Sequence, residues 1–292
     1  MEETVMKRTT SKLLTIGMVW LLATTGNVAA GDGWRTLTPP RPLPAPEATD
    51  SVQVNGAVIH YALYGSGNRD AVLLLHGGLG AAEDFGGQVD ALSERYKVVA
   101  IDSRGHGRST DDDQPYGYHL MASDVMGVMD SLGIDKAAVV GWSDGGNIGL
   151  DLAIHNPDRL TRVFALGANY RTDALRPSAF SDALVGAYVG HAAAQYARIS
   201  PTPDAWESFS GKVFAMWSEQ PAYTDAQLEG IAVPFVIAAG VYEEAIDEAH
   251  TKRMAELIPD SRLLLLGNAS HFAHWQQVEA VNAAILEFLA AE

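Results

Sequence analysis

The sequence predicts an α/β fold, with a mostly parallel, eight-stranded sheet, helices on both of its faces and a small helical cap. Short apolar runs alternate with stretches of helical periodicity, which is typical of repeated β-α units. The turn dipeptide Asn55-Gly56 indicates an antiparallel hairpin at the start of this pattern. A glycine-flanked serine, Ser143, stands between an apolar run and a helical stretch, as expected for a sharp strand-to-helix turn. The 292 residues suit one large α/β domain or two small ones, and a hydrophobic content of 47% suffices for a sizeable core.

The strands are identified by apolar runs that end in turn residues. The run 71–75 is apolar at every position, which is typical of a strand buried on both faces of its sheet. Helical connections between such runs make the strands parallel. We expect strands at 52–54, 58–64, 71–75, 98–101, 137–140, 161–166, 233–239 and 262–266.

Helices are expected between the strands, near 85–93, 119–132 and 146–154. The chain closes on a helix whose apolar residues recur at helical spacing and so share one face. These residues are Val278, Val281, Ile285, Phe288 and Leu289.

One segment, 171–229, interrupts the alternation of strands and helices. It contains no convincing strand but many aromatic residues, Trp217 among them. An excursion of this length between two strands predicts a helical cap that lines an apolar pocket over the site. A plain surface insertion is the alternative.

The first thirty residues differ in composition from the rest of the chain. Basic residues precede a short apolar run at 13–23, and small residues lead up to Ala30. This pattern predicts a signal peptide over residues 1–30, cleaved after Ala30, and therefore a secreted or periplasmic protein without stable membrane insertion. An uncleaved membrane anchor is the alternative. The proline-rich stretch 31–50 predicts an extended arm, and we expect the main domain to cover 51–292.

Charge and motif content narrow the classes of ligand. A net charge of −16 argues against nucleic acid and anionic membrane surfaces as partners, and favours neutral or hydrophobic substrates. The absence of cysteine excludes disulfides and thiolate metal sites. No glycine-rich dinucleotide motif follows the first strand, and the loop 102–109 lacks the lysine spacing of a phosphate-binding loop. Neither an HExxH motif nor a histidine and carboxylate cluster at metal-binding spacing is evident, so we expect no cofactor and no metal.

Ser143 is the strongest candidate for chemistry. Glycines stand two positions before and two positions after it, at Gly141 and Gly145. They allow a strained turn in which nothing crowds the hydroxyl, at the carboxyl edge of the sheet. A serine hydroxyl still needs a base to take its proton and a carboxylate to orient that base.

The base and the acid are expected further along the chain, after later strands. His271 lies in the loop between the last strand and the last helix, and we prefer it to His274, which is expected in the first turn of that helix. Glu243 follows the preceding strand and is the preferred acid. Its neighbour Glu244 is the alternative, and we expect it to point elsewhere, toward a salt bridge.

Two backbone N–H groups must face the negative charge that develops on an attacked carbonyl oxygen. One is expected at Asp144, directly after the nucleophile. The other is expected in the glycine-rich loop after the strand 71–75, at Gly78 with Leu79 as second choice. Leu79, Trp142 and Trp217 are the residues expected to border the substrate pocket, although Trp142 fits sheet-to-helix packing equally well.

The sequence resembles the α/β-hydrolase superfamily over residues 51–292. The resemblance rests on Leu75-His76-Gly77-Gly78, the loop 102–109, the stretch 141–146, the stretch 234–243 and Ser270-His271-Phe272. The stretch 141–146, with Gly167-Ala168-Asn169 after the next strand, is similar to biphenyl-hydrolase-like esterases and enol-lactonases. That group usually has aspartate where this chain has Glu243.

The resemblance implies cofactor-free acyl-enzyme chemistry on small to medium hydrophobic esters or lactones, with Ser143, His271 and Glu243 as the triad. Superfamily members with an aspartate nucleophile are disfavoured because the turn holds serine. Cofactor-independent haloperoxidases share the triad, which leaves perhydrolysis open as a side activity. Amide or peptide hydrolysis, as in aminopeptidases, is an alternative reaction, and a ligand-binding protein on a hydrolase scaffold is an alternative function.

Overall fold

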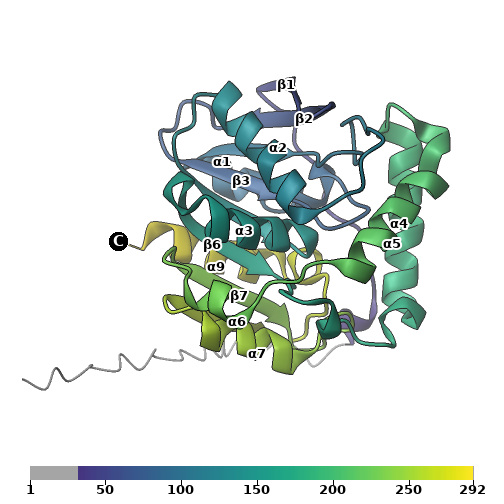
Figure 1. Ribbon diagram of the computed structural model, residues 1–292, viewed down its shortest axis with the longest axis vertical. Coiled ribbons are helices and arrows are strands. Elements are labelled where there is room, and N and C mark those ends of the chain that lie inside the picture. Colours follow the sequence, from purple (N-terminus) through teal and green to yellow (C-terminus); the bar gives the residue numbers. More distant parts are fainter. Residues whose placement is uncertain (1–31, 292) are drawn as a thin grey trace, which may run out of the picture.

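A computed structural model describes residues 32–291 of the chain (Figure 1). The signal peptide and its cleavage site, predicted for residues 1–30, therefore lie outside the described residues. Within 32–291, no helix has both the length and the apolar character needed to cross a membrane.

The core of the protein is an eight-stranded sheet with strand order β1-β2-β4-β3-β5-β6-β7-β8. The first two strands are antiparallel to each other, β2 is antiparallel to β4, and all later pairs are parallel. The predicted mostly parallel α/β sheet is thus confirmed. The strands are β1 (Ala48–Val54), β2 (Ala57–Tyr64), β3 (Ala71–Leu75), β4 (Lys97–Ile101), β5 (Ala137–Trp142), β6 (Leu160–Leu166), β7 (Phe235–Gly240) and β8 (Ser261–Leu266).

Helices cover both faces of the sheet. In Figure 1, α2 and α3 lie in front of the sheet and α9 lies behind it, where α1 also packs against α9. The apolar residues predicted to share one face of the last helix are all buried. The helices are α1 (Val89–Ser93), α2 (Tyr118–Ser131), α3 (Asp144–His155), α4 (Ala183–Ile199), α5 (Trp206–Glu219), α6 (Asp225–Glu229), α7 (Glu248–Leu257), α8 (Ala273–Gln276) and α9 (Val278–Ala290).

Two elements differ from the sequence-based expectation. Strand β1 begins at Ala48, earlier than expected, because its polar first residues form ladder pairs with β2 rather than burying apolar side chains. Helix α7 was not expected at all. It is a polar surface helix that buries only Thr251, Met254 and Leu257, too narrow an apolar stripe to stand out in the sequence.

The loop 102–109 after β4 is held by buried polar contacts. The carboxylate of Asp102 accepts hydrogen bonds from the backbone N–H groups of Ala82 and Arg108, at 2.8 and 2.9 Å. The fully buried guanidinium of Arg104 donates two hydrogen bonds to Asp124 on α2, at 2.6 and 2.7 Å. These contacts make the loop a rigid support beneath the neighbouring glycine-rich loop.

Helices α4, α5 and α6 lie between β6 and β7 in the chain, and α4 and α5 stand together at one side of the molecule (Figure 1). The rings of Tyr196 on α4 and Phe209 on α5 stack with centroids 4.7 Å apart. Tyr188 on α4 donates its hydroxyl hydrogen to the carbonyl oxygen of Gly78 at 2.8 Å. The α4–α5 pair is therefore fixed to the loop that follows β3.

The segment before β1 runs along the outside of two later loops. The Trp34 ring stacks on Tyr242, with centroids 4.1 Å apart and planes 6° apart. The side-chain amide of Gln276 donates to the carbonyl oxygens of Trp34 and Thr36 at 3.1 and 3.2 Å. The segment is thereby anchored beside the residues that precede Glu243 and follow His271.

Candidate active site

Ser143 occupies a strained turn between β5 and α3. Its φ of 51° and ψ of −116° lie in a region that L residues rarely adopt. The turn brings α3 so close to β3 that a Cβ on Gly145 would lie 1.8 Å from the carbonyl oxygen of Leu75. A Cβ on Gly141 would lie 2.3 Å from the carbonyl oxygen of Gly145. Only glycine fits at either position, which is the physical reason for the spacing seen in the sequence.

His271 and Glu243 meet at the carboxyl edge of the sheet, although they follow different strands. Nδ1 of His271 lies 2.7 Å from Oε1 of Glu243. The same oxygen accepts hydrogen bonds from the N–H groups of Ala245 and Ile246, at 3.1 and 3.2 Å, so that the carboxylate is held in place. Burial disfavours the charged imidazole, but the Glu243 carboxylate, with smaller effects from Glu244 and Asp144, raises the pKa of His271 above its ordinary value.

Glu244 contacts the same histidine through the backbone. Its Oε2 accepts a hydrogen bond from the N–H of His271 at 3.0 Å. The expected salt bridge of Glu244 is therefore wrong, because the loop turns this side chain toward the main chain of residue 271. Burial raises the pKa of Glu244 to about 7.

His274, the alternative base, lies in α8 and is buried. Its ring lies 4.3 Å from the Trp142 ring, and neither of its nitrogens has a hydrogen-bond partner within residues 32–291. Burial holds the pKa of His274 well below its ordinary value. Its position fits packing beneath the sheet edge, whereas His271 faces the acid.

Ser143 and His271 line one pocket, with about 660 Å³ of empty space, part of it open to solvent. Trp142 and Trp217 border this pocket, and Trp142 also packs in the interior, where its indole N–H donates to the carbonyl oxygen of His271 at 2.9 Å. Leu79, in contrast, is not among the lining residues. Its backbone adopts a φ of 68° and its side chain is buried in the core, so the expected pocket role of Leu79 is wrong.

Gly78 and Asp144, the expected donors to a carbonyl oxygen, lie against each other in this pocket. A Cβ on Gly78 would lie 2.4 Å from Oδ2 of Asp144 and 2.4 Å from Cζ2 of Trp217, so only glycine fits there. The N–H of Asp144 opens α3, where the first N–H groups have no partner within the helix. The positive end of α3 thus lies beside Ser143, with Gly78 against the Asp144 side chain.

The side chain of Asp144 was not anticipated from the sequence. Its carboxylate accepts a hydrogen bond from the Tyr118 hydroxyl at 2.9 Å and from the Trp217 indole N–H, also at 2.9 Å. Burial raises its pKa to about 6, although both hydrogen bonds act in the opposite direction. The sequence did contain a signal for this role, because an acidic residue stands directly after the serine. As the first residue of α3, it lies beside the pocket.

A separate group of metal-ligand residue types lies outside the pocket. His119, Asp151 and His155 lie within reach of one another, and theirs is the one such group found within residues 32–291. The search of the sequence for metal-binding spacing did not find this group. The cluster combines two helices, so it shows only weakly in the spacing of the sequence.

The sheet, the strained serine turn and the pocket beneath α4 and α5 together have the architecture of the α/β-hydrolase fold. The family model of the alpha/beta hydrolase fold matches residues 70–204, a span that contains the Gly78 loop and the Ser143 turn. The chain therefore has the α/β-hydrolase fold, as the motifs of the sequence predicted.

Individual relatives are hydrolases. RutD of Caulobacter sp. (strain K31), which is named as a carbamate hydrolase, is 29% identical over 265 residues, covering 80% of this chain and 96% of that protein. The 3-oxoadipate enol-lactonase 2 of Acinetobacter baylyi is 27% identical, covering 83% of this chain and 97% of that protein. Among solved structures, the enol-lactonase from Burkholderia xenovorans LB400 has a TM-score of 0.68 and 26% identity, covering 83% of this chain and all (100%) of that one.

Gly167 provides a test of how tightly His271 must be positioned. With a φ of 64°, it follows β6, and a Cβ there would lie 2.8 Å from Cε1 of His271. We expect Gly167→Ala to displace the ring and to slow labelling of Ser143 by a fluorophosphonate about 10- to 100-fold, because small misplacements of reacting groups are costly.

The control is Gly267→Ala, at a glycine whose Cβ would have nothing within 4 Å. It should label at the wild-type rate. Equal labelling of both variants, with both folded by circular dichroism, would contradict the positioning of His271 by Gly167.

Proposed function

We propose that the protein is a serine hydrolase that cleaves carboxylic esters or lactones through an acyl-enzyme intermediate. The observation that carries this proposal is the shared pocket. Ser143, at its strained turn, and His271, paired with Glu243 at 2.7 Å, both open onto it. A nucleophile, a base and an orienting acid around one cavity are what acyl transfer requires.

In the proposed mechanism, Nε2 of His271 takes the proton from the Ser143 hydroxyl as its oxygen attacks the substrate carbonyl. The Glu243 carboxylate fixes the ring through Nδ1 and stabilises the imidazolium that forms. The N–H groups of Gly78 and Asp144 hold the developing oxyanion. His271 then gives its proton to the leaving alkoxide, and a water molecule, deprotonated by the same ring, hydrolyses the acyl-enzyme.

The walls of the pocket favour a small to medium hydrophobic acyl group. Apolar side chains such as Leu175, Val185 and Ile246 line it, and the exposed ring of Phe180 stands at its border beside Trp217. The names of the relatives, a carbamate hydrolase and an enol-lactonase, support substrates with an acyl carbon bound to oxygen or nitrogen.

Substitution of the nucleophile tests the proposal directly. We expect Ser143→Ala to abolish fluorophosphonate labelling and to reduce hydrolysis of p-nitrophenyl esters by at least about 10³-fold, because no acyl-enzyme can form. A panel of esters, lactones, carbamates and aminoacyl anilides then ranks the reactions.

Ser181→Ala is the matched control, since Ser181 is an exposed hydroxyl between β6 and α4. It should behave as wild type. A folded wild-type protein that is neither labelled nor active on any member of the panel would instead favour the ligand-binding alternative.

The pH dependence of hydrolysis tests the pairing of acid and base. The imidazole must be neutral to accept a proton, so kcat/KM should fall as the pH drops through the raised pKa of His271. Glu243→Gln removes the charge that raises this pKa. We expect the acid limb of the profile to move to lower pH, and kcat/KM at its plateau to fall about 10²- to 10⁴-fold.

Glu244→Gln is the comparison, because Glu244 binds the main chain of His271 and acts on the ring only through its charge. It should move the acid limb less and keep the plateau rate within about tenfold of wild type. A larger loss in Glu244→Gln than in Glu243→Gln would assign the acid to Glu244.

A second candidate function is hydrolysis of esters or amides that carry a cationic amine near the acyl carbon. The buried carboxylate of Asp144 in the pocket wall favours it, because it offers a counter-charge next to Ser143. Asp144→Asn should then lose aminoacyl ester hydrolysis while retaining neutral esters. A proportional effect on both substrates would exclude this candidate.

We also propose that the protein is exported, because residues 1–30 have the pattern of a signal peptide. Mass spectrometry of the protein from a bacterial periplasmic fraction should find an N-terminus at Gly31. Full-length protein that remains with the membranes would favour the uncleaved anchor.

A further inference from the structure

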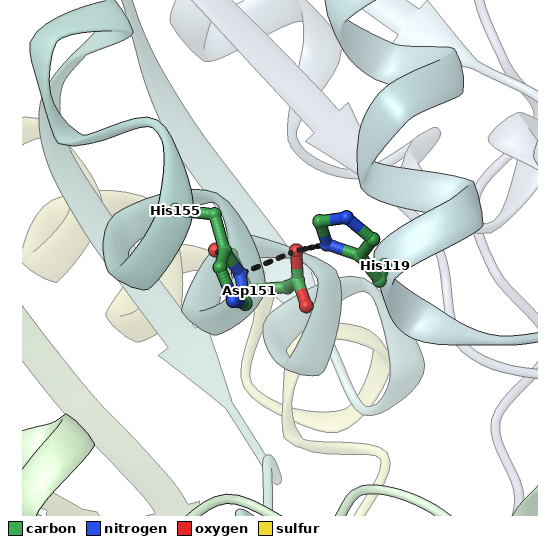
Figure 2. A group of neighbouring side chains, drawn as sticks. All are labelled: His119, Asp151 and His155. Carbon is green, nitrogen blue, oxygen red and sulfur yellow. Dashed lines mark hydrogen bonds and ion pairs between the residues drawn. The ribbon is translucent and has the colours of Figure 1, made fainter.

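His119, Asp151 and His155 form a compact cluster where α2 packs on α3 (Figure 2). His119 lies near the start of α2, and Asp151 and His155 lie one helical turn apart on α3. Nδ1 of His119 and Nδ1 of His155 lie 3.0 and 3.1 Å from the same carboxylate oxygen, Oδ1 of Asp151. Figure 2 shows the two rings on either side of this oxygen.

Two imidazoles and one carboxylate are a donor set that suits Zn²⁺ and other late divalent transition metals. The three ligand atoms lie within 4.8 Å of one another. Metal–ligand bonds of about 2.0–2.1 Å at tetrahedral angles place ligand atoms roughly 3.3 Å apart. The observed Nδ1–Oδ1 distances of 3.0 and 3.1 Å are within a few tenths of an ångström of this value, and the two imidazole nitrogens lie no more than 4.8 Å apart.

The three side chains of the cluster differ in their solvent exposure. The Asp151 side chain is 1% exposed, while His155 is 38% and His119 is 73% exposed. The other carboxylate oxygen, Oδ2, accepts a hydrogen bond from the Tyr223 hydroxyl at 2.7 Å. A buried, oriented carboxylate with an outer hydrogen-bond partner is typical of metal ligands, and the exposed side leaves room for water as the remaining ligand.

We propose that His119, Asp151 and His155 bind one divalent transition-metal ion of the zinc type. The ion joins the start of α2 to α3 and, through Tyr223, to the segment that returns from α5 to α6. That segment also reaches the pocket, because Gln220 lines it and accepts a hydrogen bond from the N–H of Tyr118. The bound ion therefore acts as a structural clamp for this side of the pocket, with Asp151 about 12 Å along α3 from Ser143 at a rise of about 1.5 Å per residue.

The competing account is that the two imidazole N–H groups and the Tyr223 hydroxyl simply satisfy a buried carboxylate. The metal site and the satisfied carboxylate are both consistent with the same contacts, and a measurement of metal affinity distinguishes them. Isothermal titration of the chelator-treated full chain with Zn²⁺ should give one site per chain with a micromolar or lower Kd. His119→Ala and His155→Ala should each weaken binding at least about tenfold, and Tyr223→Phe about tenfold through its loss of support for the carboxylate.

The matched control is His191→Ala, at a partly buried histidine on α4 outside the cluster, which should bind Zn²⁺ like wild type. Zn²⁺ should also raise the thermal midpoint of wild type but not of His119→Ala. Absence of binding below millimolar Zn²⁺ would overturn the proposal. So would binding that survives His119→Ala and His155→Ala but is lost in His271→Ala, since the ion would then lie in the pocket. Neither readout requires catalysis, so the result stands apart from that of the hydrolase proposal.

Discussion

The close approach of α3 to β3 is the constraint on which the site depends. Helix and strand come together so tightly that the carbonyl oxygen of Leu75 occupies the space a side chain at Gly145 would need. Because the chain must leave β5 and enter α3 within one residue, Ser143 takes up the strained backbone conformation. The same approach brings the start of α3 against the loop after β3, so that Asp144 and Gly78 become neighbours. One close approach therefore brings the Ser143 turn, Gly78 and Asp144 together.

Three carboxylates lie close enough to the His271 ring to affect its pKa. Glu243 faces the ring of His271, Glu244 faces its main chain, and Asp144 lies on the other side beneath Trp217. All three act on the imidazole by raising its pKa, against the effect of burial. The arrangement favours the protonated form of the imidazole. It also makes the interior of the pocket attractive to positive charge.

The sequence was most informative where one physical requirement dominates. The inner strand β3 was predicted at the same residues because full burial leaves only apolar side chains, and the turn at Ser143 because only glycine fits around it. The start of β1 and helix α7 were missed because ladder hydrogen bonds and a narrow buried stripe leave little trace in hydrophobicity. Contacts between side chains on two packed helices or strands were not visible in the sequence. His119 is 32 residues from Asp151, and only the crossing of α2 on α3 joins them.

The stretch ahead of β1 has a practical consequence for work with this protein. Trp34 covers the loop that leads to Glu243, and Gln276 links the carbonyl oxygens of that stretch to the N–H of Ser270, next to His271. A recombinant fragment that begins at β1 would contain every strand. It would lack the contacts that Trp34 makes with Tyr242 and that the backbone of Trp34 and Thr36 makes with Gln276. A fusion partner joined directly before Trp34 would lie beside the same loops, so a purification tag is better placed at the far end, after α9.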